Sequence, residues 1–132
     1  MADLSNYLEA ALINAVLRNT AYTSPATVYV ALFTAVTDAE AGTGTEVTGG
    51  AYARVSCAFD APASPGGTTQ NTAIITFPTA TAAWGTVTHA ALFDALTAGN
   101  PLTVIKALAA SKVVGAGDIV RFPVGDIDFS LA

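Results

Sequence analysis

The sequence predicts a mainly β fold, an antiparallel β-sandwich of about six to seven short strands with one N-terminal α-helix. Short apolar or alternating segments are separated by clusters of Gly, Pro, Asn and Asp, a spacing typical of sandwiches and barrels. Strands do not alternate with helices, so a parallel α/β sheet is not expected. The 132 residues fit one globular domain, with residues 1–25 as a helical arm and residues 26–132 as the sandwich.

The helix is expected over residues 4–18, and Asp3 or Ser5 can cap its start. Its apolar side chains recur at helical spacing on one side: Leu4, Leu8, Leu12 and Val16. Such a stripe suits packing on the chain's own sheet, and it equally suits an arm that docks on a neighbouring subunit. The sequence leaves both interpretations open.

The first strand is expected at residues 27–35, where both faces carry apolar groups, so it should be central or covered on both sides. Residues 36–50 are expected to form a long loop, of the kind that is often functional or interfacial. The remaining strands are predicted at residues 52–60, 72–77, 86–93, 102–109, 119–122 and 127–131. In the strand at 86–93, Val87, His89, Ala91 and Phe93 should share one face.

Charge is scarce in this chain. Only 11% of residues are charged, against about 25% in an ordinary soluble domain, and the mean hydropathy is +0.52. Obligate interfaces are more apolar than ordinary surface, so part of the surface is expected to be buried against other subunits in a homo-oligomer. The net charge is −5, and the five basic residues are scattered: Arg18, Arg54, Lys106, Lys112 and Arg121.

Several classes of partner are not expected from these features. Nucleic-acid binding starts from a basic patch, which five scattered cations do not build, and an anionic membrane surface is disfavoured for the same reason. No apolar run of 18 residues is present, so no membrane span is expected. Cys57 is the single cysteine, either a small buried hydrophobic residue or a partner for Cys57 of a neighbouring chain.

No constellation of catalytic, cofactor-binding or metal-binding residues emerges. His89 is the only histidine. A Ser–His–Asp catalytic triad built on His89 and Asp94 would also need a serine nucleophile, and the sequence has no Gly-x-Ser-x-Gly elbow. Two acidic pairs leave calcium conceivable, although their spacing matches no EF-hand loop: Asp38 with Glu40, and Asp126 with Asp128. We therefore predict a protein that is not an enzyme and has no cofactor.

Residues 45–55 concentrate polar groups in a loop that re-enters a sheet. A glycine pair at positions 49–50 turns the chain, and Tyr52 enters the next strand. Arg54 is expected to pair with Glu46 or another acid and to lock the loop, or to reach an acid on a neighbour. The suggested interface residues are Leu4, Leu8, Leu12, Glu46, Tyr52, Arg54 and Trp84.

Several segments in order resemble one known family. They are VALFTA at 30–35, GTEVTGGAYARV at 44–55, NTAIITFP at 71–78, WGTVTH at 84–89, FD at 93–94 and GD at 117–118. This order, which covers nearly the whole chain, resembles small virion structural proteins of tailed bacteriophages, often labelled tail fibre proteins. The resemblance implies a virion location, with assembly in the reducing cytoplasm of the host bacterium, which suits a chain without disulfides.

The position on the virion is open at this point. A capsid decoration (cement) protein, a trimer that bridges subunits of the major capsid protein, is favoured because the chain is short and has no shaft repeats. A tail, neck or fibre-associated component, bound to another virion structural protein, is one alternative. A carbohydrate-binding module that stacks sugars on Trp84, Tyr52 or Tyr29 is another.

Overall fold

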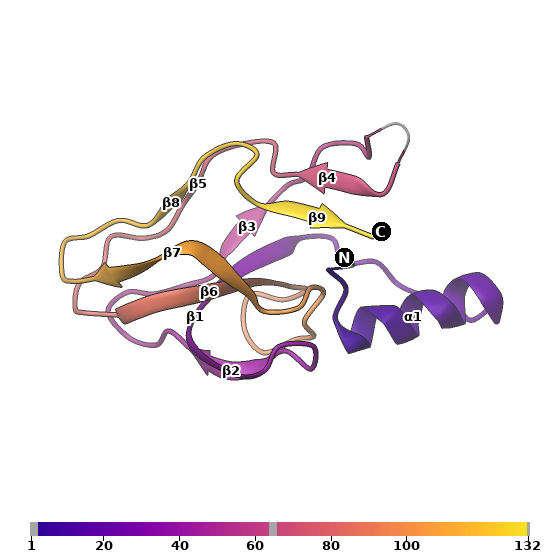
Figure 1. Ribbon diagram of the computed structural model, residues 1–132, viewed down its shortest axis with the longest axis horizontal. Helices are drawn as coiled ribbons and strands as arrows, with labels where there is room; N and C mark the ends of the chain where they lie inside the picture. Colours follow the sequence, from indigo (N-terminus) through magenta and orange to yellow (C-terminus); the bar gives the residue numbers. More distant parts are fainter. Residues whose placement is uncertain (1–2, 64–65, 132) are drawn as a thin grey trace.

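Residues 3–63 and 66–131 are described by the structure, a computed structural model, and they form one helix and nine strands (Figure 1). The helix is α1 (Asn6–Leu17). The strands are β1 (Val28–Asp38), β2 (Thr43–Glu46), β3 (Val55–Cys57), β4 (Thr68–Gln70), β5 (Ile75–Thr76), β6 (Gly85–Phe93), β7 (Lys106–Val114), β8 (Arg121–Phe122) and β9 (Asp128–Ser130).

The largest sheet is five-stranded and antiparallel, with β1 near its centre. One edge of β1 pairs with β6, where Leu32 lies opposite Ala90. The other edge is shared, because β3 pairs with the first part of β1 and β2 with the last part. β7 lies outside β6, and two small antiparallel sheets, β4–β9 and β5–β8, complete the fold.

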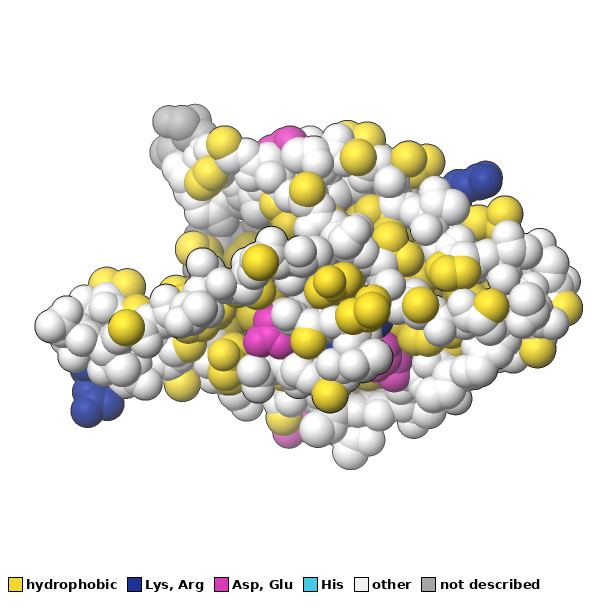
Figure 2. Space-filling view, turned by 180° about the vertical axis from the view of Figure 1, so that it is seen from behind, with side chains coloured by type: hydrophobic (Ala, Val, Ile, Leu, Met, Phe, Trp, Pro, Cys, Tyr) yellow, Lys and Arg dark blue, Asp and Glu magenta, His cyan; other side chains and the backbone are white. Residues whose placement is uncertain are grey.

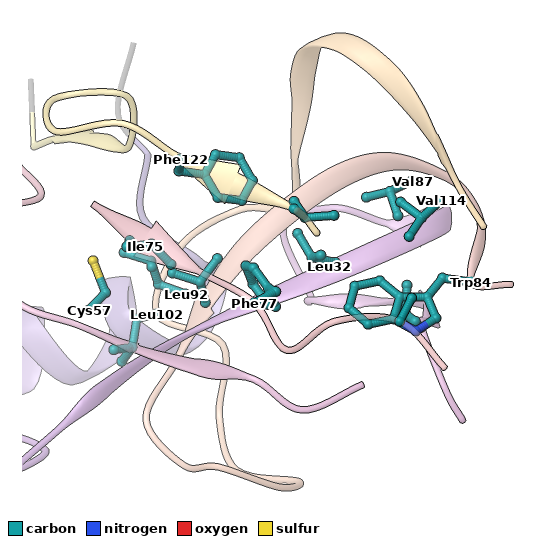
Figure 3. Close-up of a cluster of buried hydrophobic side chains, with 14 residues drawn as sticks. Leu32, Cys57, Ile75, Phe77, Trp84, Val87, Leu92, Leu102, Val114 and Phe122 are labelled. Atoms are coloured by element: carbon teal, nitrogen blue, oxygen red, sulfur yellow. The ribbon is translucent and has the colours of Figure 1, made fainter. Parts of the chain in front are cut away.

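The main core lies between the large sheet and the β5–β8 pair (Figure 3). Leu32 and Val87 from the large sheet meet Ile75 and Phe122 from the small one. A second cluster covers the opposite face of the large sheet: Ala31, Phe33, Ala91, Phe93 and Ile105. Burial of each large apolar side chain stabilises the fold by about 1.5–3 kcal/mol.

This arrangement confirms the mainly β class with antiparallel sheets and a single helix. It also confirms the coverage of β1 on both faces, because its four central residues are at most 3% exposed: Val30, Ala31, Leu32 and Phe33. The number of strands was underestimated, since nine rather than six or seven occur among the described residues. The additional strands are short and polar.

The prediction of a single loop over residues 36–50 is wrong. β1 continues to Asp38, and β2 returns beside it to form a hairpin, with Gly42 at a φ of 71° in the turn. The sequence of β2, Thr-Gly-Thr-Glu, has no apolar alternation, so its strand conformation depends on pairing with β1. The expected strand at 52–60 is reduced to β3, and the side chains of Tyr52 and Arg54, which precede it, bind Glu46.

The strand predicted at 102–109 begins later and extends further, as β7. Opposite β6, the register of β7 jumps from Val87–Lys112 to His89–Ala107. The expected alternation within β6 is also broken, because Val87 packs in the main core while Ala91 and Phe93 lie in the cluster on the opposite face. The prediction that these side chains share one face is therefore wrong for Val87.

Cys57 lies in the main core and is 7% exposed, and burial raises the pKa of its thiol to about 11. The thiolate is the nucleophile in alkylation. We expect iodoacetamide to modify Cys57 at pH 8 about 200-fold more slowly in the folded protein than in urea, as judged from the thiolate fractions alone. Equal rates, measured by mass spectrometry, would show that the thiol is accessible.

The raised pKa of Cys57 also makes the free energy of unfolding fall with pH in the alkaline range. The unfolded thiol loses its proton at a lower pH than the folded one, so this contribution is complete below about pH 8.5 and declines as the pH rises through about 11. Cys57→Ala should flatten the fall of unfolding free energy over that range.

Candidate functional site

Glu46, Tyr52 and Arg54 form a hydrogen-bonded cluster beside the large sheet. Arg54 Nε donates to Glu46 Oε2 at 2.9 Å, and Nη2 donates to Oε1 at 2.8 Å, so the ion pair is bidentate. The Tyr52 hydroxyl donates to Glu46 Oε2 at 2.7 Å and accepts the backbone N–H of Leu32 at 3.0 Å. The predicted pairing of Arg54 with Glu46 is confirmed.

The guanidinium also reaches the loop between β6 and β7. Arg54 Nη1 donates to the carbonyl oxygens of Ala95 and Ala98, both at 2.8 Å. Its Cζ lies 4.1 Å from the centroid of the Phe93 ring, a cation–π distance. One side chain therefore joins the end of β2, the approach to β3 and the loop after β6.

The turn at residues 48–51 places Tyr52 and Arg54 in the cluster. Gly49, Gly50 and Ala51 all have positive φ, and the N–H of Tyr52 closes the turn on the Gly49 carbonyl at 2.9 Å. Trp84 Nε1 donates to the Gly50 carbonyl at 2.9 Å, and the Tyr52 ring meets the Trp84 ring edge-on, with centroids 5.3 Å apart. The turn is thus fixed to the core.

Gly50 and Gly49 offer a matched test of this turn. A Cβ on Gly50 would lie 2.8 Å from Trp84 Nε1 and 2.8 Å from the Ala82 carbonyl, whereas a Cβ on Gly49 would meet nothing within 4 Å. We expect Gly49→Ala to cost about 1 kcal/mol, from the left-handed conformation alone. Gly50→Ala should cost about 2 kcal/mol more, because of the overlap. Equal losses in urea unfolding would contradict the packing of Trp84 on this turn.

Burial and hydrogen bonding govern the electrostatics of the cluster. Burial raises the pKa of Tyr52, and its bond to Glu46 adds to the rise while the N–H of Leu32 opposes it, so the phenol stays protonated at neutral pH. Burial opposes the charge of Arg54, but the hydrogen bond and the charge of Glu46 outweigh it and raise the pKa of Arg54. The ionised pair is therefore the stable form.

The cluster satisfies its own polar groups. Three nitrogens of Arg54 and both oxygens of Glu46 are used, and no buried side-chain nitrogen or oxygen in the described part of the chain lacks a partner. Glu46, Tyr52 and Arg54 also line a pocket of about 390 Å³, together with Leu96 and Ala98. The hydrogen bonds of the cluster hold these segments of the chain together.

The other suggested interface residues mostly face the body. Leu4 is half-buried and bridges Thr103; Leu8 is half-buried against the main core, and Leu12 is half-buried. Trp84 is 5% exposed. Trp84 therefore presents no open ring face for a sugar, and the half-buried Tyr52 ring stacks on Phe77.

The exposed apolar surface of α1 lies elsewhere, near its C-terminal end. Ile13, Val16 and Leu17 are 54, 75 and 77% exposed. The helix extends away from the sheets, and Figure 2 shows hydrophobic side chains on this projection. The helical spacing of the sequence predicts these residues to be in the helix but does not indicate that they face solvent, because periodicity alone does not say which side of a helix meets the sheet.

The residues considered for chemistry lie in separate local networks. His89 Nδ1 hydrogen bonds with Thr88 Oγ1 at 2.7 Å, and Asp94 accepts from the N–H of Asn100 at 2.7 Å. Over residues 3–63 and 66–131, no three His, Cys, Asp or Glu side chains converge as metal ligands would. Within the same ranges no helix is long and apolar enough to cross a membrane.

Comparison with known proteins places the chain among bacteriophage virion structural proteins. A family model described as "Podophage GP4 fiber I protein gp80" matches residues 3–130. The chain belongs to this family, which confirms the resemblance seen in the sequence. No curated protein gives a significant match.

Proposed function

We propose that this protein is a non-enzymatic subunit of a phage tail fibre, assembled from several copies of the chain. One observation carries the proposal, the projecting helix α1 with the apolar side chains of Ile13, Val16 and Leu17 in solvent. Among the large hydrophobic side chains of the described residues, Val16 and Leu17 are the most exposed, and Ile13 lies near them on the same helix. Surfaces of this kind mark interaction sites.

The length of α1 supports the same conclusion. It has 12 residues, and isolated helices of about that length are marginal in water, since most helix stability comes from packing of an apolar face. None of its residues is fully buried. Covering three large aliphatic side chains would contribute about 1.5–3 kcal/mol each, which a partner subunit can supply.

The fibre location is favoured over the capsid by the description of the family, which names a fibre protein. The capsid decoration protein remains the second candidate, supported by the low content of charged residues, 11%. In that case the partner is the major capsid protein, and a trimer would bridge its subunits. In either case the partners are virion proteins, assembly takes place in the host cytoplasm, and no cofactor takes part.

A cryo-electron microscopy reconstruction of the intact particle, with the chain located by its fold, tests the location. Copies at the tail, in a multiple of the tail symmetry, are the expected result. Hundreds of copies over the head would instead establish the decoration protein, and absence from the particle would overturn both. Truncation of residues 1–25 is a poor substitute, because Asp3 and Ser5 are buried in the body and would be lost with the arm.

A further inference from the structure

An apolar groove shares no lining residue with the pocket at the Arg54 cluster. It has a volume of about 500 Å³ and lies between β7 and the segment that contains β8 and the approach to β9. Its apolar lining includes Val87, Leu108, Val120, Phe122 and Ile127. β7 is the last strand of the large sheet, and β8 pairs only with β5, so no described strand covers the seam between them.

The irregular register of β7 shapes this groove. Two steps along β6, from Val87 to His89, are matched by five steps along β7, from Lys112 to Ala107. Three extra residues are therefore accommodated in β7, where a bulge bends the strand. Leu108, Ala109 and Ala110 from this segment line the groove.

Cationic side chains surround the groove although the chain is acidic overall. Lys106, Lys112 and Arg121 all line it. Lys106 is neutralised, since its Nζ lies 3.2 Å from Asp3 Oδ1 and 3.6 Å from Asp128 Oδ1. Lys112 and Arg121 have no ion-pair partner among the described residues, and Asp126 is the one further acid of the lining. With Asp3 counted, these charges balance, so the groove offers apolar surface with two unpaired cations, Lys112 and Arg121, in its lining.

The exposed side of α1 has the complementary character. Glu9, Ile13, Val16 and Leu17 follow the spacing i, i+4, i+7 and i+8, so they lie along one side of the helix. The stripe begins with a carboxylate and continues with the three exposed aliphatic side chains. It fits an apolar groove with cations at its edge.

We propose that α1 of one copy docks in the β7–β8 groove of a second copy. Ile13, Val16 and Leu17 cover the apolar lining, and Glu9 lies beside Lys112 or Arg121. The contact joins two different surfaces, so it is heterologous, and it generates a closed ring or an open filament according to the rotation between copies. The surface that covers the exposed side of α1 is thus the β7–β8 groove of a second copy. Only the location of this contact in the virion rests on the proposed function.

Complementation between two defective variants tests the docking. Val16→Ser/Leu17→Ser removes the apolar arm and keeps the groove, whereas Ala110→Trp fills the groove and keeps the arm. We expect wild type to self-associate in analytical ultracentrifugation, each variant alone to be monomeric, and their mixture to form 1:1 dimers through the remaining arm and groove. Circular dichroism and thermal melting establish that both variants are folded.

The other outcomes each overturn the proposal. If Ala110→Trp still self-associates, the helices pack on each other or on another surface. If wild type remains monomeric at every concentration, α1 serves a different virion protein. Neither result affects the location of the chain in the particle, so the proposed function is judged separately by the reconstruction.

A charge exchange provides an independent readout of the orientation. Glu9→Lys should weaken self-association about tenfold, as expected for loss of one charge pair and gain of a repulsion. Lys112→Glu/Arg121→Glu should weaken it similarly, and the combination of all three substitutions should restore it. Additive losses in the combined variant would exclude a contact between Glu9 and these cations.

Discussion

Arg54→Ala is expected to lower the unfolding free energy by about 3 kcal/mol, the lower end of the range for breaking a buried ion pair by removing one partner. The arginine side chain is 6% exposed and that of Glu46 is 24% exposed, so Glu46 can recover part of its hydration. The carbonyls of Ala95 and Ala98 lose their donor as well. Urea unfolding followed by tryptophan fluorescence measures the loss, and the folded protein should retain its β-rich circular dichroism.

Two further variants define the origin of that loss. Arg54→Lys keeps the positive charge but lacks the planar guanidinium that makes the bidentate bond. Its free energy of unfolding should therefore lie between those of wild type and Arg54→Ala. Arg18→Ala removes an exposed arginine that bonds only Asn14 of its own helix, and it should change stability by less than about 0.5 kcal/mol. If Arg54→Ala lowered the unfolding free energy as little as Arg18→Ala, the cluster would not hold together the end of β2, the approach to β3 and the loop after β6.

Asn71→Ala is expected to be the other severe substitution, also at about 3 kcal/mol, because buried groups are left without partners. Asn71 is 0% exposed. Its Nδ2 donates to the carbonyls of Ala73 and Pro123 at 2.8 and 3.0 Å, and its Oδ1 accepts the N–H of Ile127 at 3.0 Å. The amide thereby joins the segment before β5 to the segment between β8 and β9.

Asn71→Asp separates hydrogen bonding from size. The substitution would place a carboxylate oxygen against two carbonyl oxygens, so the neutral acid is the form that the site accepts. Its folded pKa should lie above the unfolded value of about 3.9, and the variant should lose less stability at pH 4 than at pH 7. A loss that is independent of pH would show that the side-chain amide does not face these carbonyls.

The sequence predicted those features in which the deciding residues lie close together along the chain. β1 was recognised as covered on both faces because its residues are apolar at consecutive positions. Glu46 was one of the expected partners of Arg54, and the two lie close together along the chain, with the turn at 48–51 between them. In both cases local pattern and final contact coincide.

Other features depend on partners that are distant along the chain. β4 (Thr68–Gln70) has no apolar residue and is a strand because it pairs with β9. Asn71 was not singled out at all, since its side-chain partners Pro123 and Ile127 lie 52 and 56 positions away. The exposed side of α1 could not be predicted for a related reason. Contacts with distant parts of the chain fix the orientation of the helix, and the spacing of its apolar residues does not reveal those contacts.

The base of α1 also determines how mechanical load would enter the molecule. The three residues Asp3, Ser5 and Asn6 hydrogen bond to parts of the chain that are far apart in sequence: Glu40, Pro101, Leu102, Val104 and Ser130. A pull on the helix would therefore stress the β1–β2 turn, the approach to β7 and the last strand simultaneously. Bonds loaded together resist more than bonds that open one after another, so tension on the arm is shared by these three segments.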